Sequence, residues 1–276
     1  MRHDNNKGCS MSVQAAELLN KVRSRRPVVH HITNWVTIYD CANIVKVFGA
    51  SPVMAHAKEE VAEMAQIADA LVLNIGTLTV ELVDAMKLAA KSANKKGIPV
   101  ILDVCGAGAT SLRDKKCMEL LKETKINVIK GNASEVARIS GKVVQTRGVD
   151  STEVSEDLVV LATYLAQERN CTVVITGAED IVTDGNKVFL VRNGHPMMAK
   201  IVGTGCMATS VIGAFCAVAA NDLATASAAG LVCYEVAAEQ AAAQTQGAGS
   251  FKEKLFDAVY NLTADAVSLG QNVKES

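Results

Sequence analysis

The sequence predicts an α/β protein in which a mostly parallel central sheet is flanked by helices. Two observations indicate this class. Short apolar runs alternate with longer amphipathic segments over the first two thirds of the chain, and the last third has an almost entirely helical pattern. No linker, low-complexity tract or repeat divides the 276 residues, so we expect a single domain over 1–276, with 1–11 as a poorly ordered N-terminal extension.

The expected strands are apolar runs that end in small or polar residues. The run ALVLNI at 70–75 is apolar at nearly every position, which is typical of a parallel strand buried on both faces. A hairpin is expected over 181–191, because Asp184-Gly185 tolerates the positive φ of a primed turn. The remaining strands are expected at 27–33, 98–103, 126–129 and 172–176.

The expected helices repeat apolar residues at helical spacing, and Gly49 and Gly97 stop two of them. The run from Met207 to Ala220 is about two thirds of the length of a membrane span, so we expect it to be a buried helix. The full set of expected helices is 12–22, 39–48, 59–67, 79–94, 115–123, 132–139, 155–168, 206–220, 223–244 and 251–269.

Composition narrows the function. The formal net charge is -1, with 28 basic and 29 acidic residues, so nothing electrostatic recruits nucleic acid or an acidic membrane. Eight cysteines form no CxxC pair, and the histidines form no HExxH motif. The N-terminus lacks the apolar stretch of a signal peptide. We therefore expect a cytoplasmic protein with reduced thiols, in which the cysteines other than Cys206 fill apolar core.

Small and hydrogen-bonding residues follow several of the predicted strands. In a parallel α/β sheet, ligands bind at the carboxyl ends of the strands, which these residues would occupy. Any one of them could equally be part of a turn or a helix cap, but together they indicate a polar ligand site. They are Thr33-Asn34, Asn74, Gly76-Thr77, Asp103, Lys130-Gly131-Asn132 and Thr176-Gly177.

The segment Gly203-Thr204-Gly205-Cys206 opens a long helix of small residues. Glycines let backbone N–H groups approach an anion, and a helix N-terminus favours negative charge. The segment is neither a GxxxxGK[ST] loop nor a dinucleotide fingerprint, and a simple turn that caps the helix is an equally good interpretation. A thiol at this position has a lowered pKa, so Cys206 could accept a proton or act as a nucleophile.

Two carboxylates could serve a divalent cation. Asp103 ends a strand, and Glu135 lies in the first turn of the predicted helix 132–139. Mg²⁺ bound with phosphates needs only one or two carboxylates, often through water. Glu135 could instead form a capping box with Asn132, and the two roles are compatible. His30-His31 is expected to belong to the core, and Met54 to fill a gap or to line a pocket for a small heterocycle.

Seven segments together resemble the hydroxyethylthiazole kinase family, and the resemblance extends from about residue 12 to residue 269. The segments are HHITNWV (30–36), ASPVMAHA (50–57), LVLNIGTL (71–78), ILDVCGAGAT (101–110), VIKGNASEV (128–136), VITGAEDIVTDG (174–185) and VGTGCMATSVIGAF (202–215). The resemblance implies a ribokinase-like fold and phosphorylation of the primary alcohol of 4-methyl-5-(2-hydroxyethyl)thiazole by ATP and Mg²⁺, in thiamin salvage. It also implies a homotrimer with its active sites at subunit interfaces.

The resemblance assigns roles by position. It implies that the substrate is bound by Met54, Asn34, Gly76, Thr77 and Gly203. It implies that ATP is bound by Lys130, Thr176 and Asp103. The metal ion and the phosphates would be held by a network that includes Asp103 and Glu135. The catalytic residues implied are Gly203, Gly205 and Cys206. Cys206 occupies the position at which related sugar kinases have a catalytic Asp.

Two departures from the family and two rival classes remain. The family commonly has DPVGAG where this chain has DVCGAG at 103–108, and usually has Arg where this chain has Lys130. The ammonium of Lys130 is a point charge, which orients a phosphate less tightly than the two parallel hydrogen bonds of an arginine.

Two other functions remain possible interpretations of the sequence: a related ribokinase-like enzyme, such as a pyrimidine-alcohol kinase or a nucleotide-repair dehydratase, and a non-catalytic binding protein. Cys206 argues against the first, and the presence of Asp103 and Glu135 against the second.

Overall fold

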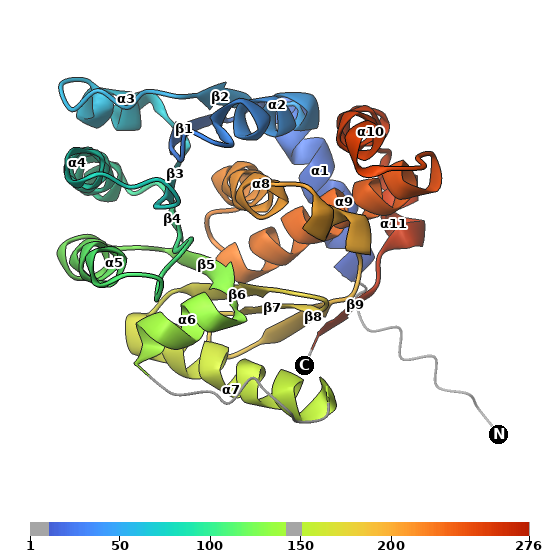
Figure 1. The fold of residues 1–276 in the computed structure, drawn as a ribbon. Coiled ribbons are helices and arrows are strands. Elements are labelled where there is room, and N and C mark those ends of the chain that lie inside the picture. The colour runs from blue at the N-terminus through green and yellow to red at the C-terminus, as the bar shows by residue number, and fades with distance from the viewer. Residues whose placement is uncertain (1–10, 142–150, 276) are drawn as a thin grey trace.

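The computed structural model describes residues 11–141 and 151–275, which form a nine-stranded sheet with helices on both faces (Figure 1). The strand order is β2-β1-β3-β4-β5-β6-β7-β8-β9, parallel up to β6 and antiparallel from β6 to β9. The strands are β1 (Val28–Ile32), β2 (Ser51–Val53), β3 (Ala70–Asn74), β4 (Val100–Asp103), β5 (Val128–Asn132), β6 (Thr172–Thr176), β7 (Asp180–Thr183), β8 (Val188–Val191) and β9 (Val273–Glu275).

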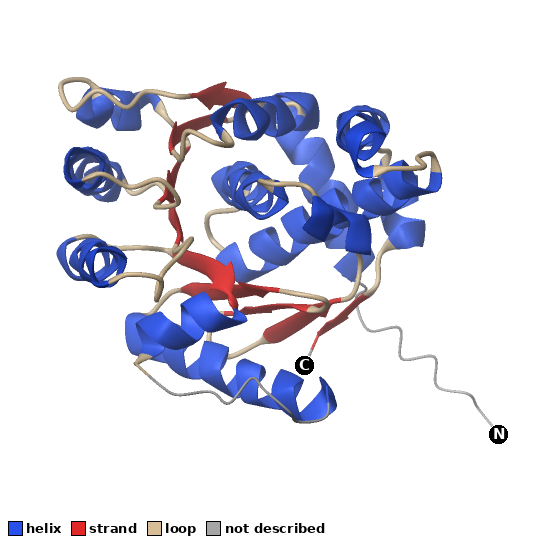
Figure 2. Ribbon diagram, in the orientation of Figure 1, coloured by secondary structure: helices blue, strands red, loops and turns tan. Residues whose placement is uncertain are grey.

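Helices cover the two faces of this sheet, as Figure 2 shows by colour. On one side lie α3, α4 and α5, and on the other α8 with α1, α9 and α10 behind it (Figure 1). The helices are α1 (Met11–Arg25), α2 (Ile38–Phe48), α3 (Val61–Ile67), α4 (Val80–Lys96), α5 (Ser111–Glu123), α6 (Ala133–Ser140), α7 (Ser151–Arg169), the 3-10 helix η1 (Pro196–Lys200), α8 (Thr204–Val218), α9 (Leu223–Ala243), α10 (Ala248–Asn261) and α11 (Ala264–Gly270).

Two hydrophobic cores, one on each face, explain why the strands are continuous apolar runs. Leu71 and Leu73 of β3 pack in the core under α4, whereas Val72 between them packs in the core under α8. Each such side chain stabilises the fold by about 1.5–3 kcal/mol when fully buried. A Cβ on Gly213 would lie 2.4 Å from Val72 Cγ2, so glycine at this position lets α8 lie directly on β3.

Most predicted elements are present, including the hairpin of β7 and β8, but several features differ, among them the 3-10 helix η1, which was not predicted. Strands β2 and β9 were not predicted, because each has three residues at or near a sheet edge and lacks an apolar run. The predicted helix 251–269 is wrong: Thr263 accepts a hydrogen bond from the Ala266 N–H and starts α11 as a separate helix. Helix α5 begins at Ser111 rather than Lys115 because the Thr110 side chain caps it.

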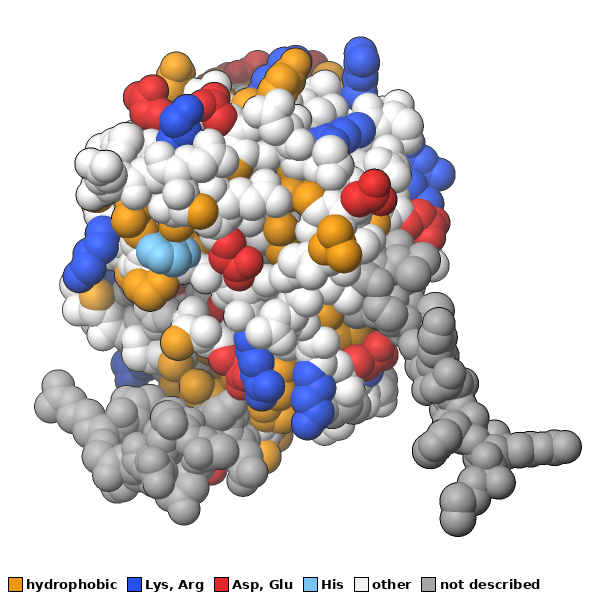
Figure 3. Space-filling model, turned by 90° about the vertical axis from the view of Figure 1, so that its right-hand side faces the viewer, with side chains coloured by type: hydrophobic (Ala, Val, Ile, Leu, Met, Phe, Trp, Pro, Cys, Tyr) orange, Lys and Arg blue, Asp and Glu red, His pale blue; other side chains and the backbone are white. Residues whose placement is uncertain are grey.

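Two further expectations concern the ends of the chain and its surroundings. Residues 1–10 of the predicted N-terminal extension lie outside the described residues, and Met11 belongs to α1. Within the described ranges, none of the helices combines the length and apolarity that a bilayer crossing requires. On the face drawn in Figure 3, basic and acidic side chains are scattered among apolar and uncharged ones, in keeping with the formal net charge of -1.

Candidate active site

The carboxyl ends of β1 and β3 meet the N-terminus of α8 at Cys206. The amide nitrogens of Asn34, after β1, and Asn74, at the end of β3, each donate a hydrogen bond to Cys206 Sγ at 3.3 Å. The Gly76 N–H donates to Asn74 Oδ1 at 2.8 Å, and Thr77 Oγ1 accepts from the Trp35 N–H at 3.0 Å. The predicted Asn34 therefore contacts Cys206 directly, whereas Gly76 and Thr77 are joined to its neighbours Asn74 and Trp35.

Asp103, at the end of β4, is buried under the same helix. Its Oδ2 accepts hydrogen bonds from Thr209 Oγ1 at 2.7 Å and Asn74 Nδ2 at 2.9 Å, and lies 3.5 Å from Lys130 Nζ. Its Oδ1 is buried without a hydrogen-bond partner among the described residues. One carboxylate oxygen thus fixes the network, and the other remains available to a donor or a cation.

Lys130 of β5 places a buried positive charge below the first turn of α8. Its Nζ donates to the Gly205 carbonyl at 3.1 Å. Burial alone would lower the pKa of this ammonium, but the negative charges of Asp103, Cys206 and Glu135 outweigh burial and raise it. Lys130 is therefore protonated at neutral pH and adds to the positive field at the helix N-terminus.

Gly203 forms the N-cap of α8 in a backbone conformation that strongly disfavours a side chain. Its φ is +97°, and a Cβ there would lie 2.5 Å from Thr37 Cγ2. Thr37 is itself fixed, because its N–H and Oγ1 both donate to Asn34 Oδ1 at 3.1 Å. Within the described chain no side chain caps α8, so its first-turn N–H groups are available to an anion.

The Cys206 thiol is unusually acidic. A hydrogen bond from Cys105 is the main cause that lowers the pKa of Cys206 to about 6, and Thr37 and Lys130 act in the same direction against burial and Asp103. The same contact, together with burial, raises the pKa of Cys105. The lowered pKa favours the thiolate form of Cys206 at neutral pH, with Cys105 as the neutral partner. The direction is the one predicted from the helix position, but its main cause is the hydrogen bond from Cys105.

The expectation that all the other cysteines fill apolar core is wrong for Cys105, which is half-buried at the site. Its position in the turn after β4 brings it to Cys206, which the sequence alone did not indicate. Cys9 lies outside the described residues. The cysteines confirmed as buried are Cys41, Cys117, Cys171, Cys216 and Cys233.

Glu135 stabilises the turn after β4 through hydrogen bonds to backbone N–H groups. Its Oε1 accepts from the Gly106 N–H at 2.7 Å and its Oε2 from the Asn132 N–H at 2.8 Å, while Asn132 Oδ1 accepts from the Glu135 N–H at 2.9 Å. The predicted capping box is confirmed. Because both carboxylate oxygens already bind backbone N–H groups, any contact of Glu135 with a metal would be additional to its structural role.

His30 and His31 are fully buried in β1, as expected of core groups. The ring of His30 hydrogen-bonds the Ala55 carbonyl at 2.9 Å, and burial lowers the pKa of His31 to about 3. Met54 is half-buried and follows the edge strand β2, which pairs with β1. Its role in substrate binding stays a prediction.

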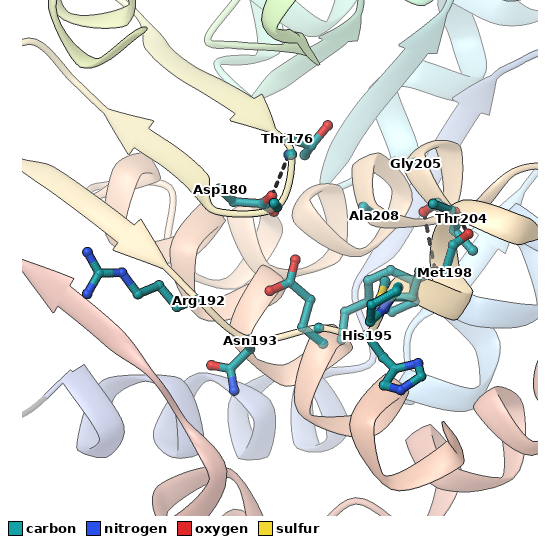
Figure 4. Close-up of a pocket in the computed structure, with 16 residues that line it drawn as sticks. Thr176, Asp180, Arg192, Asn193, His195, Met198, Thr204, Gly205 and Ala208 are labelled. Carbon is teal, nitrogen blue, oxygen red and sulfur yellow. Dashed lines mark hydrogen bonds between the residues drawn. The ribbon is translucent and has the colours of Figure 1, made fainter. Parts of the chain in front are cut away.

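A cavity of about 540 Å³ begins at the N-terminus of α8 (Figure 4). Thr176, at the end of β6, and Thr204 with Gly205 lie in its wall, so the predicted Thr176 borders the same site as the predicted anion hole. Two acidic residues of the wall, Asp180 and Glu235, were missed. The sequence carries a signal for Glu235, since it is a lone acid in the apolar run LVCYEVAA of a buried helix.

Comparison with known proteins first defines the class. A ribokinase-like superfamily protein from Enterococcus faecalis superposes on 92% of this chain and 83% of its own, with a TM-score of 0.57 and 14% identity, which shows a ribokinase-like fold. The structure of a hydroxyethylthiazole kinase protein from Pyrococcus horikoshii covers 96% of this chain and 99% of its own, with a TM-score of 0.89 and 39% identity.

Two sequence comparisons narrow the class to a family. The hydroxyethylthiazole kinase family matches residues 19–265. A relative from Methanosarcina mazei, named hydroxyethylthiazole kinase, is 50% identical over 257 residues, which cover 93% of this chain and 98% of the relative. The chain belongs to the hydroxyethylthiazole kinase family.

Proposed function

We propose that this protein transfers the γ-phosphoryl group of ATP to the primary alcohol of 4-methyl-5-(2-hydroxyethyl)thiazole, a reaction of thiamin salvage. The observation that carries the proposal is the thiolate of Cys206 at the uncapped N-terminus of α8, held by Asn34 and Asn74 above the buried pair of Asp103 and Lys130. Family membership supplies the substrate class.

Phosphoryl transfer depends on alignment and on charge stabilisation more than on covalent help from the protein. The N–H groups at the start of α8 bind the equatorial oxygens of the transferred group. Lys130 adds a positive charge next to them, at the Gly205 carbonyl. Gly203 keeps the approach open, since a side chain would strike Thr37.

Cys206 receives and orients the substrate hydroxyl. A thiolate whose pKa is about 6 is a weak base toward an alcohol, which is about as weak an acid as water. The hydroxyl proton therefore leaves late, after the bond to phosphorus has begun to form. Cys206 acts mainly by hydrogen-bonding and positioning the nucleophilic oxygen.

We extend the proposal to Mg²⁺. Asp103 suits this ion because its Oδ1 is a buried carboxylate oxygen without a partner in the described chain, whereas Glu135 would act through water. The described residues hold no cluster of three or more metal-binding side chains, and Mg²⁺ bound with phosphates needs only one or two carboxylates. When bound, the ion would neutralise charge on the β- and γ-phosphates.

We further propose a cytoplasmic homotrimer whose active sites lie at the subunit interfaces. Trp35, Val36 and Tyr39 support it, because these apolar side chains are 56%, 66% and 76% exposed directly after the site residue Asn34. Exposed apolar groups that border a site favour cover by a partner. A light-scattering mass of three chains, which falls on substitution of Tyr39 by Glu, is the expected result; a monomer would contradict it.

A coupled ADP-release assay with a panel of hydroxyalkyl heterocycles tests the proposed function. We expect ADP only with Mg²⁺, and the thiazole alcohol to give the highest kcat/KM, with its phosphate identified by mass spectrometry. A pyrimidine alcohol as the best acceptor would favour the related kinase. ATP binding without ADP release from any alcohol would favour a binding protein.

A further inference from the structure

Two buried carboxyl groups lie in the wall of the cavity, away from the Cys206 cluster. Asp180, at the start of β7, is 4% exposed, and Glu235, in the middle of α9, is 6% exposed. Their side chains are hydrogen-bonded to each other. Two carboxylates cannot share a hydrogen bond unless one of them holds a proton, so the pair carries a single negative charge.

The proton belongs to Glu235. Burial raises the pKa of both carboxyl groups, but the Gly177 N–H, which donates to Asp180 Oδ1 at 2.9 Å, favours the charged form of Asp180, whereas the charges of Asp180 and Glu239 add to burial and raise the pKa of Glu235 further. Glu235 therefore donates to Asp180 through one oxygen. Glu235 Oε2 is buried and accepts no hydrogen bond from the described residues, so the carboxyl group keeps an unused acceptor capacity where it lines the cavity.

The place of Glu235 in the cavity indicates which part of a ligand it meets. The preceding residue, Tyr234, donates from its hydroxyl to the Thr204 carbonyl at 3.2 Å, so this turn of α9 is joined to the N-terminus of α8 that would hold the phosphates, and Glu235 lines the same cavity. On its other side the carboxyl group approaches Gly194, whose Cβ would lie 3.6 Å from Glu235 Cδ and from Met198 Sδ.

The chemistry of the wall suits a nucleoside rather than a phosphate. Phosphate offers acceptors and negative charge, which an acceptor atom next to a carboxylate would repel. A nucleoside offers hydroxyl and amino donors on a flat, largely apolar body. The apolar part of the wall matches this body and consists of Ala178, Pro196, Met198, Ala199, Ala208 and Tyr234.

We propose that Glu235, held in place by Asp180, is a specificity-determining residue that accepts a hydrogen bond from the nucleoside part of ATP. The donor is a ribose hydroxyl or the exocyclic amine of the base. This inference rests on the proposed function and adds to it the atom by which the site recognises its nucleotide. A site built to bind a donor discriminates against analogues that lack it, because its buried acceptor is then left unpaired.

Steady-state kinetics of the wild-type protein with four nucleotides identify the donor. ATP is compared with 2′-deoxy-ATP, 3′-deoxy-ATP and inosine triphosphate, at saturating thiazole alcohol. We expect the analogue without the donor to raise KM about tenfold, with kcat within about twofold. Equal KM for all four nucleotides would overturn the proposal. Absence of thiazole phosphate with every nucleotide would instead refute the proposed function.

Three variants test the residue itself. Glu235→Met removes the acceptor at similar size and should raise KM for ATP about tenfold and abolish the discrimination among nucleotides. Glu235→Gln keeps an acceptor and a donor to Asp180, so it should recover most of the loss. Glu239→Gln is the matched control, since Glu239 lies one turn later on α9 and binds the Gly194 N–H at 2.8 Å without lining the cavity.

The control separates a direct contact from an indirect one. If Glu239→Gln loses the nucleotide discrimination as Glu235→Met does, the effect comes from the loop at Gly194, and the proposal fails. It also fails if Glu235→Met binds ATP with wild-type affinity in calorimetry. If Glu235→Met does not fold, the analogue series on the wild-type protein still decides the proposal.

Discussion

Replacing Gly203 by alanine would place a methyl group against Thr37 at the mouth of the proposed anion site. The new Cβ would lie 2.5 Å from Thr37 Cγ2, well inside van der Waals contact, at a φ of +97°. The chain offers a matched control in Gly97, which follows α4 with a φ of +82° and has nothing within 4 Å of its Cβ position. The two substitutions share the backbone strain, and only Gly203→Ala adds the collision.

The magnitudes follow from these two terms. A side chain in the left-handed region costs about 1–2 kcal/mol, which both variants should lose from the free energy of unfolding. Forcing the extra methyl group into packed surroundings costs about 1–3 kcal/mol more in Gly203→Ala. If the collision shifts the first turn of α8, one anion-binding N–H is lost, which lowers kcat about 100- to 1000-fold.

Urea unfolding and the ADP-release assay measure both effects. Gly97→Ala should keep kcat within about twofold, because its site is remote from the cluster around Cys206. Thr37→Ser keeps the hydroxyl that donates to Asn34 Oδ1 and removes the methyl group that collides. In that background, Gly203→Ala should regain at least about threefold in kcat. The reasoning is refuted if Gly203→Ala and Gly97→Ala have equal activity.

Three further predictions concern side chains of the cluster. Alkylation of Cys206 by iodoacetamide, followed by peptide mapping, should have its half-maximal rate at a pH of about 6 and fall below it as the thiolate is protonated; a midpoint above 8 would contradict the hydrogen-bond account. Lys130→Met should lower the free energy of unfolding by about 3–5 kcal/mol, measured in urea, because Asp103 stays buried without its cation, and Lys130→Arg should lose less. Asn132→Ala should lower the free energy of unfolding by about 1 kcal/mol and leave the Mg²⁺ concentration for half-maximal rate unchanged. Glu135→Gln should raise that Mg²⁺ concentration. If both variants need the same Mg²⁺ concentration as the wild-type protein, the role of Glu135 is restricted to capping α6.

The parallel strands, and the proximity of the residues at their carboxyl ends, could be predicted because a strand that is buried on both faces has a continuous apolar sequence. The run at 70–75 is apolar at every position except Asn74, which ends β3 and lies at the carboxyl edge of the sheet, where the fold class places ligand-binding residues. Short edge strands lack such a continuous apolar run. β9 has the sequence Val-Lys-Glu and pairs, among the described strands, with β8 alone, so its pairing depends on the rest of the fold.

Contacts between distant segments could not be predicted. Thr209 lies 106 residues from Asp103 and donates to it because α8 lies on β3 and β4, a register that no local pattern specifies. The same holds for Cys105 and Cys206, which meet across a turn and a helix end. Residue chemistry predicted a lowered pKa for Cys206, but the hydrogen bond from Cys105 that is its main cause required the tertiary structure.

The central claim is that the N-terminus of α8 receives the phosphoryl group next to Cys206. A crystal structure with the thiazole alcohol, Mg²⁺ and a non-hydrolysable ATP analogue tests it most directly. We predict γ-phosphate oxygens roughly 3 Å from the backbone nitrogens of Gly205 and Cys206, with the substrate hydroxyl beside Cys206 Sγ. A γ-phosphate bound elsewhere, with the first turn of α8 in contact only with solvent or protein, would contradict the account.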